Sequence, residues 1–158
     1  MMNQTMAPAV VETPAPWLVE VEITTFGVLH GKPPEPRHPQ SLIRIDLRHA
    51  LRNPFDDLAM RELTGLDEVV RGHVMGTEGA DEILRDALGM VLAQRAAGPT
   101  AGLIEVYSYC KGGRHRSVAM ALALQSALAE LGIGAEVVHL DIAKPVVGKG
   151  EVPAGFRG

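Results

Sequence analysis

The stretch IEVYSYCKGGRHRSVAMAL, residues 104–122, decides the fold of this chain. A run of β-prone residues ends at Tyr109, a cysteine, two glycines and a basic cluster follow, and an Ala- and Leu-rich helical pattern then begins. A strand, a glycine loop and a helix N-terminus in this order can cradle a phosphate group. Glycine lets successive N–H groups turn towards one point, and the helix start adds unpaired donors. The stretch therefore predicts a phosphate-handling α/β domain.

Strand and helix patterns alternate through the rest of the chain. Alternating or short apolar runs predict strands over residues 17–26, 42–47, 103–109 and 135–142. Helical spacing predicts a helix after Thr64 with a capping arrangement at Asp67, and helices over 80–97 and 115–131. Residues 27–40 hold four prolines and two glycines, which predicts a long surface loop.

This order of elements predicts a single-domain α/β fold, a layered sheet with flanking helices, over residues 17–144. The helix at 115–131 is expected to cross between neighbouring parallel strands. Residues 1–16 are rich in Ala, Pro and Thr and are expected to form a flexible leader, with 145–158 as a loose tail.

The composition restricts the classes of function. The 158 residues carry a formal net charge of −4, which argues against strong nucleic-acid binding through a generally basic surface. A single cysteine excludes an intramolecular disulfide, which favours the reducing cytoplasm. No secretory signal, membrane-spanning run or zinc-ligand spacing is visible in the sequence. We expect a cytoplasmic protein with no metal and no cofactor.

The glycine loop and its basic residues are the expected anion site. Cations at a helix start are disfavoured by the helix dipole, so a basic cluster there suggests a compensating anion. The Arg116 guanidinium can grip two phosphate oxygens, and Lys111 can act as a mobile charge. Ser117 either donates to the anion or caps the backbone, and His115 either contacts the phosphate or is packed structurally. The expected ligand-binding residues of the loop are Cys110, Lys111, Gly112, Gly113, Arg114, His115, Arg116 and Ser117.

Asp46 and Arg48 are expected to lie beside this loop. Ligands gather at the carboxyl ends of parallel strands, and both residues close the strand at 42–47. Asp46 either pairs with Arg48 or accepts sugar hydroxyls, and its place at the strand end favours the second. The loop at 27–31 could join the same rim, and His139 and Asp141 are weaker candidates.

The segment from Cys110 to Ser117 also has the C-x5-R-S spacing that resembles the phosphate loop of cysteine-dependent protein tyrosine phosphatases. In that chemistry the Cys110 thiolate would attack phosphorus and Arg116 would clamp the phosphate. Tyr109 stands where those phosphatases usually have histidine, and a buried structural cysteine is the competing interpretation. The candidates for the general acid are Asp46, Asp56 and Asp57.

Several motifs in the same order are similar to the C-terminal domain of the RapZ-type RNase adaptor family, formerly described as P-loop nucleotide-binding proteins. The similarity runs from about Glu20 to Lys144. The motifs are TFGVLHGKP (25–33), IDLRHALRNP (45–54), RELTGLDEVVRGHV (61–74), CKGGRHRSV (110–118) and HLDIAK (139–144).

The resemblance implies an α/β fold, oligomerisation and a site for an amino-sugar phosphate, glucosamine-6-phosphate. The family pattern carries over to Asp46, Arg48, Cys110, Gly112, Gly113, His115, Arg116 and Ser117. Lys111 replaces a family threonine and Arg114 a lysine. Full-length family members begin with a Walker-type domain, and this chain has no G-x-x-x-x-G-K-[ST], so nucleotide hydrolysis is not carried over.

The sequence thus predicts a regulatory domain that holds a phosphorylated metabolite, a sugar phosphate such as glucosamine-6-phosphate, and signals to a protein partner without catalysis. The first alternative is a cysteine-dependent phosphatase. The second is an RNA-binding adaptor, which would need an oligomer to assemble a basic patch from Arg37, Arg44, Arg48 and Arg52.

Overall fold

The computed structural model describes residues 11–12, 19–98 and 102–146, and only the backbone of Val11 and Glu12. The strands are β1 (Val11–Glu12), β2 (Val19–Gly27), β3 (Ile43–Asp46), β4 (Ile104–Cys110) and β5 (Gly134–His139). The helices are α1 (Glu68–Met75), α2 (Ala80–Ala97) and α3 (Arg116–Glu130). Short 3-10 turns are η2 (Val28–His30), η3 (Pro39–Ser41) and η4 (Pro54–Asp56).

The sheet has the strand order β1-β5-β2-β4-β3. Strands β2 to β5 are parallel, and β1 is antiparallel to β5 at one edge. Helix α3 therefore connects β4 to β5 across β2, and the expectation that it joins neighbouring strands was wrong. The physical reason is the burial of β2, whose Val21, Ile23 and Thr25 are inaccessible to solvent, so that this strand needs a neighbour on each side.

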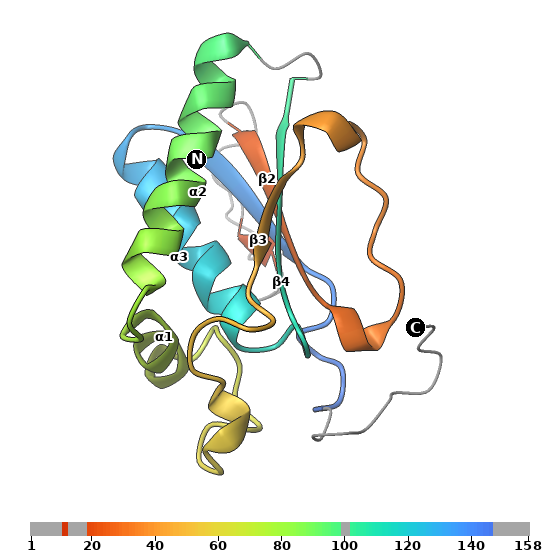
Figure 1. The fold of residues 1–158 in the computed structure, drawn as a ribbon, viewed down its shortest axis with the longest axis vertical. Helices are drawn as coiled ribbons and strands as arrows, with labels where there is room; N and C mark the ends of the chain where they lie inside the picture. Colours follow the sequence, from red (N-terminus) through yellow and green to blue (C-terminus); the bar gives the residue numbers. More distant parts are fainter. Residues whose placement is uncertain (1–10, 13–18, 99–101, 147–158) are drawn as a thin grey trace, which may run out of the picture.

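The two faces of the sheet are covered differently. Figure 1 shows α2 and α3 on one face, while residues 28–42, which we call the cover loop, lie on the other. Successive side chains of a strand point to opposite faces. The face under the helices carries the apolar set, which includes Ile23, Val106 and Val137, and packs against Leu124 and Leu128 of α3. The alternation in the sequence thus builds the main apolar core, and a second cluster lies between α1 and α3 and contains Met60, Val70, Val74 and Ala119.

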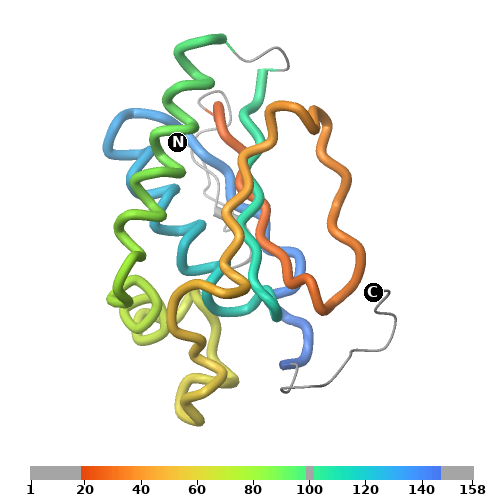
Figure 2. The backbone as a smooth tube through the Cα atoms, viewed as in Figure 1, coloured from red at the N-terminus to blue at the C-terminus, as the bar shows by residue number. Residues whose placement is uncertain are grey.

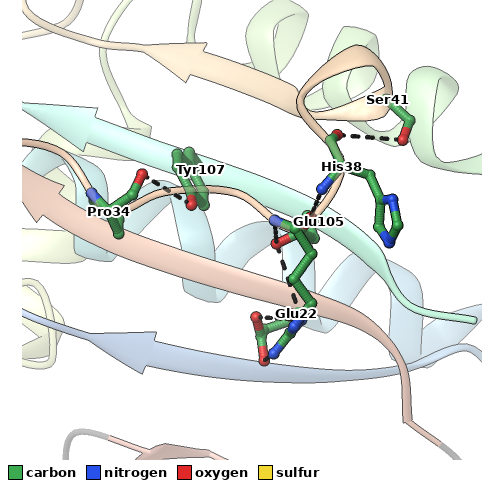
Figure 3. Close-up of polar contacts among 7 residues, drawn as sticks. Glu22, Pro34, His38, Ser41, Glu105 and Tyr107 are labelled. Carbon is green, nitrogen blue, oxygen red and sulfur yellow. Dashed lines mark hydrogen bonds and ion pairs between the residues drawn. The ribbon is translucent and has the colours of Figure 1, made fainter. Parts of the chain in front are cut away.

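Polar contacts hold the cover loop on the opposite face (Figure 3). The Glu105 carboxylate accepts hydrogen bonds from the backbone N–H groups of Arg37 at 3.2 Å and His38 at 3.0 Å. The Tyr107 hydroxyl donates to the Pro34 carbonyl at 3.2 Å. The tube in Figure 2 shows the cover loop leaving the end of β2 and returning to the start of β3. It thereby closes a face that no helix covers.

Element boundaries agree in part with the sequence pattern. Helix α2 has the expected limits, 80–97, whereas β5 ends at His139 rather than at residue 142. The N–H of Thr64 donates to the Asp67 carboxylate at 2.8 Å, which is one contact of the expected arrangement, but Asp67 is the N-cap residue of α1 and its side chain makes no capping bond to the helix. The helix itself begins only after Asp67.

Most of the expected leader and tail lies outside the described residues. Within the expected leader, Val11 and Glu12 pair with Val138 and Val137 of β5, so a short strand forms where no regular structure was expected.

Candidate functional site

The loop between β4 and α3 packs its backbone directly against the end of β2. A Cβ atom on Gly27 would lie 2.3 Å from the carbonyl carbon of Gly112. A Cβ on Gly113 would lie 2.4 Å from the Gly27 nitrogen, and Gly113 also has a φ of +70°. Gly112 has open space around it. Gly27 and Gly113 are therefore required for close backbone approach.

The loop ends at a buried helix N-terminus that has no capping side chain. His115 occupies the N-cap position without a side-chain capping bond, and the first turn of α3 contains no acidic residue. Arg116 is 5% exposed and Ser117 is fully buried. The first N–H groups of a helix lack intrahelical partners and carry the positive end of its dipole. A buried, uncapped end of this kind suits an anion.

Cys110 lies inside the loop rather than on its surface. Its Sγ accepts the N–H of Gly113 at 3.2 Å and lies 3.3 Å from the Ser117 hydroxyl oxygen. The Ser108 hydroxyl donates to the Ser117 carbonyl at 2.9 Å. The side chain of Cys110 is buried. The thiol therefore donates to the Ser117 hydroxyl oxygen, and one backbone N–H, that of Gly113, donates to the atom that a cysteine phosphatase would use as nucleophile.

Arg114 does not lie in the loop interior. Its guanidinium donates to the backbone carbonyls of Glu62, Leu63, Ile142 and Lys144. It therefore joins two segments that are about 80 residues apart in the chain. Arg114 was expected from the sequence to bind the phosphate, but in this conformation its guanidinium is hydrogen-bonded to the backbone of these two segments.

His115 is also engaged with the backbone. Its Nε2 lies 3.0 Å from the carbonyl oxygen of Arg61, and burial lowers the pKa of the imidazole. A neutral ring donates one hydrogen bond here, which favours the packed interpretation of this histidine.

Arg116 is the buried cation at the start of α3. One Nη donates to the carbonyls of Arg48 at 3.3 Å and Ala50 at 3.2 Å, and so holds the turn before Leu51, whose φ is +65°. Its Nε is buried and has no hydrogen-bond partner among the described residues. A buried charged donor without a partner is costly, so this nitrogen calls for an acceptor that the described residues do not supply.

Asp46 and Arg48 lie at the end of β3, beside the end of β4. The Leu47 N–H donates to the Tyr109 carbonyl at 2.8 Å, so the predicted neighbourhood of the two loops is present. The Arg48 guanidinium grips the Asp46 carboxylate at 2.7–3.1 Å and lowers its pKa. Both oxygens of Asp46 are therefore engaged, and both side chains are partly exposed.

The candidates for a general acid and for an RNA-binding patch lie elsewhere. Asp56 and Asp57 line an open hollow with Asn53 and His73, and Cys110 is not part of its lining. Arg37 of the proposed RNA patch pairs with Glu22 at 3.2 Å.

Three buried side-chain nitrogens lack a hydrogen-bond partner in the described part of the chain. They are Nε2 of His30, Nε of Arg116 and Nε2 of His139. Each residue follows or ends a different parallel strand, β2, β4 or β5, at its carboxyl end. All three residues thus come at or after the carboxyl end of a parallel strand, the edge where ligands of such sheets bind. His139 keeps its other nitrogen 2.7 Å from the Thr25 hydroxyl, and burial lowers its pKa to about 4.

Sequence reasoning missed His30 and Lys144 and ranked Asp141 low. The buried Asp141 carboxylate accepts the Gly27 N–H at 2.7 Å and pairs with the Lys144 ammonium at 2.5 Å. The available signal was the position of these residues, because each follows the carboxyl end of β2 or β5. All three also lie in motifs that carry the family resemblance, TFGVLHGKP (25–33) and HLDIAK (139–144), whereas only the loop after β4 has the glycine-rich phosphate pattern.

No cluster of three or more histidine, cysteine or acidic side chains suitable for a metal ion occurs in the described segments. Among the same segments, none of the helices has the length and apolar character needed to cross a membrane.

Comparison with known proteins agrees with the motifs. The RapZ C-terminal domain family matches residues 19–143. A protein of Erythrobacter litoralis named "Nucleotide-binding protein" is 34% identical over 139 residues, which cover 85% of this chain and 44% of that protein. Proteins of the same name from Saccharopolyspora erythraea and Salinispora arenicola are 33% and 32% identical, over 84% and 80% of this chain and 44% and 41% of theirs. The chain thus spans less than half the length of these relatives.

Proposed function

Because the chain belongs to the RapZ C-terminal domain family, we propose that it is a regulatory domain that binds a phosphorylated metabolite at the loop between Cys110 and Ser117. The proposed ligand is a sugar phosphate such as glucosamine-6-phosphate, and the occupied site signals to a protein partner. The proposed domain spans residues 17–144 and acts in the cytoplasm, as part of a homo-oligomer.

One observation carries this proposal. The Arg116 guanidinium is buried at the uncapped N-terminus of α3, and its Nε has no partner among the described residues. A phosphate oxygen would supply the acceptor, and the helix dipole would stabilise its charge. The name of the relatives supports a phosphorylated ligand in general terms, and it makes a nucleotide the nearest alternative.

The geometry divides the expected ligand-binding residues into those that would contact the phosphate and those that would hold the surrounding backbone. Arg116, Ser117 and the first N–H groups of α3 would contact the phosphate. Arg114 and His115 would hold the surrounding segments, since their side chains already bind carbonyls. Lys111, whose side chain is exposed, would add a mobile charge at the rim.

The test is a thermal-shift titration with inorganic phosphate, glucosamine-6-phosphate, glucose-6-phosphate and ATP. A ligand at 100 times its Kd stabilises the folded state by about 2.7 kcal/mol. Replacement Arg116→Met should remove the shift, whereas Arg85→Met on the exposed face of α2 should keep it. Circular dichroism identifies folded variants, and Ser117→Ala serves if Arg116→Met does not fold. If no phosphate compound shifts the wild-type transition, the proposal is wrong.

A cysteine phosphatase is the second candidate, because Cys110 Sγ lies beside the N–H of Gly113 and the hydroxyl of Ser117. A backbone N–H such as that of Gly113, which donates to this sulfur, stabilises a thiolate. Hydrolysis of p-nitrophenyl phosphate by the wild type and its loss in Cys110→Ser would establish this activity. Phosphate binding retained by Cys110→Ser without any wild-type hydrolysis would support the binding domain instead.

A further inference from the structure

A second group of polar side chains borders the loop on the side of β2 and β5. Asp141 is 4% exposed, and a Cβ on Gly113 would lie 3.0 Å from its Cβ, so the carboxylate stands beside the glycine loop. Its two oxygens are held by the Gly27 N–H and by the Lys144 ammonium. The Lys144 side chain is 48% exposed and can reach solvent or a ligand.

His30 approaches the same place from the start of the cover loop. The N–H of Leu29 donates to the carbonyl of Lys111 at 3.0 Å, which fixes the η2 turn against the glycine loop. The charges of Asp141 and Lys144 both act on the His30 imidazole, while burial has the largest effect and lowers its pKa. His30 is therefore neutral at pH 7, and its buried Nε2 has no partner in the described part of the chain.

The backbone that carries Lys144 is also held in place. Arg114 donates to the carbonyls of Ile142 and Lys144, and the Lys144 N–H donates to the Asp141 carbonyl at 3.0 Å. Lys144 is thus a flexible side chain on a fixed segment. Such a residue can bind a ligand with little reorganisation of the backbone.

We propose that His30 and Lys144 form a second arm of the phosphate site and bind hydroxyl groups of the ligand, an inference that rests on the proposed function. Together with the Asp141 carboxylate that pairs with Lys144, the arm has one carboxylate, one ammonium and one neutral imidazole, so its charge is balanced at neutral pH. A balanced group of donors and acceptors suits hydroxyl groups better than a second anion. The ligand class is then a phosphorylated polyhydroxy compound. Asp46, the residue first assigned to the sugar, already has both oxygens bonded to Arg48.

The test compares Kd for inorganic phosphate with Kd for glucose-6-phosphate, glucosamine-6-phosphate and ribose-5-phosphate, measured by calorimetry. The readout is the Kd for inorganic phosphate divided by the Kd for the sugar phosphate that binds most tightly. A substitution that weakens only the binding of the phosphate group changes both Kd values equally and leaves this ratio unchanged. The variants are His30→Phe, which keeps a ring without nitrogen, and Lys144→Met, which keeps the stem. The controls are His38→Phe and Lys32→Met, both on the cover loop.

We expect the wild-type ratio to exceed about ten and to fall at least about five-fold in each variant, with the controls unchanged; ten-fold corresponds to about 1.4 kcal/mol. A wild-type ratio near one, or an unchanged ratio in folded His30→Phe and Lys144→Met, overturns the second arm alone. A wild type that binds neither phosphate nor any sugar phosphate overturns the proposed function together with it. If Lys144→Met does not fold, His30→Phe decides.

Discussion

The two faces of the sheet are closed by different forces. On one face, α2 and α3 bury side chains such as Ile23, Val106 and Leu124 away from water. On the other, the cover loop is attached through Glu105, Tyr107 and other polar contacts. Burial of apolar surface stabilises the helix-covered face, whereas water can replace the hydrogen bonds of the cover loop at little net cost. We therefore expect the helix-covered face to contribute most of the free energy of unfolding.

The largest effect is expected from Leu124→Ala in α3, because Leu124 is completely buried against the sheet. The lost side chain leaves a cavity, and the free energy of unfolding should fall by about 4 kcal/mol. Urea unfolding followed by circular dichroism measures the change. A decrease below about 1 kcal/mol would contradict the assignment of stability to this face.

Gly113→Ala tests the edge where the loop meets β2. The added methyl group would meet the Gly27 nitrogen at 2.4 Å at a residue with φ of +70°, so we expect a loss of about 3 kcal/mol and of phosphate binding. The matched control is Gly112→Ala, which has open space and should change stability by less than about 1 kcal/mol. Equal effects of the two substitutions would show that the close approach is unimportant.

His139 places a titratable group within the buried face. Burial lowers its pKa to about 4, below the ordinary 6.5, so the unfolded chain binds the proton more readily. The low pKa of His139 in the folded protein does not reduce the free energy of unfolding above pH 6.5, and the reduction grows as the pH falls towards 4. Between pH 6.5 and 4.5 the free energy of unfolding of His139→Asn should therefore fall by about 2 kcal/mol less than that of the wild type. Denaturant titrations at each pH measure this, with His38→Asn as control. Parallel pH profiles of wild type and His139→Asn would refute the interpretation.

Tyr107→Phe should have the smallest effect. The substitution removes only the hydrogen bond from the hydroxyl to the Pro34 carbonyl and keeps the ring that contacts Phe26 edge to face. We expect a loss of about 1 kcal/mol or less in unfolding free energy. Faster amide hydrogen exchange confined to residues 28–42 would be the local sign. A loss as large as that of Leu124→Ala would mean that the cover loop contributes equally to stability.

Local sequence patterns were sufficient to predict strands β2 to β5, the helices, and the loop between β4 and α3 that forms the candidate site. Gly79 and Gly98 bound the helix at 80–97 on both sides, so its limits could be predicted from sequence. The strand, glycine loop and helix at 104–122 likewise needed no distant partner to be recognised. The motif could also place Asp46 and Arg48 at the same rim, because parallel strands end together.

An α/β domain and a candidate anion loop between Cys110 and Ser117 could be predicted from the sequence, because strand alternation, glycine freedom and helix periodicity are local properties. Only the tertiary structure decided that Arg114 binds carbonyls of distant segments while the Arg116 Nε remains unpartnered among the described residues. The two arginines are equivalent in composition and two positions apart. Their roles differ because hydrogen-bond partners are set by the segments packed beside each side chain, and the order of residues along one loop does not contain that information.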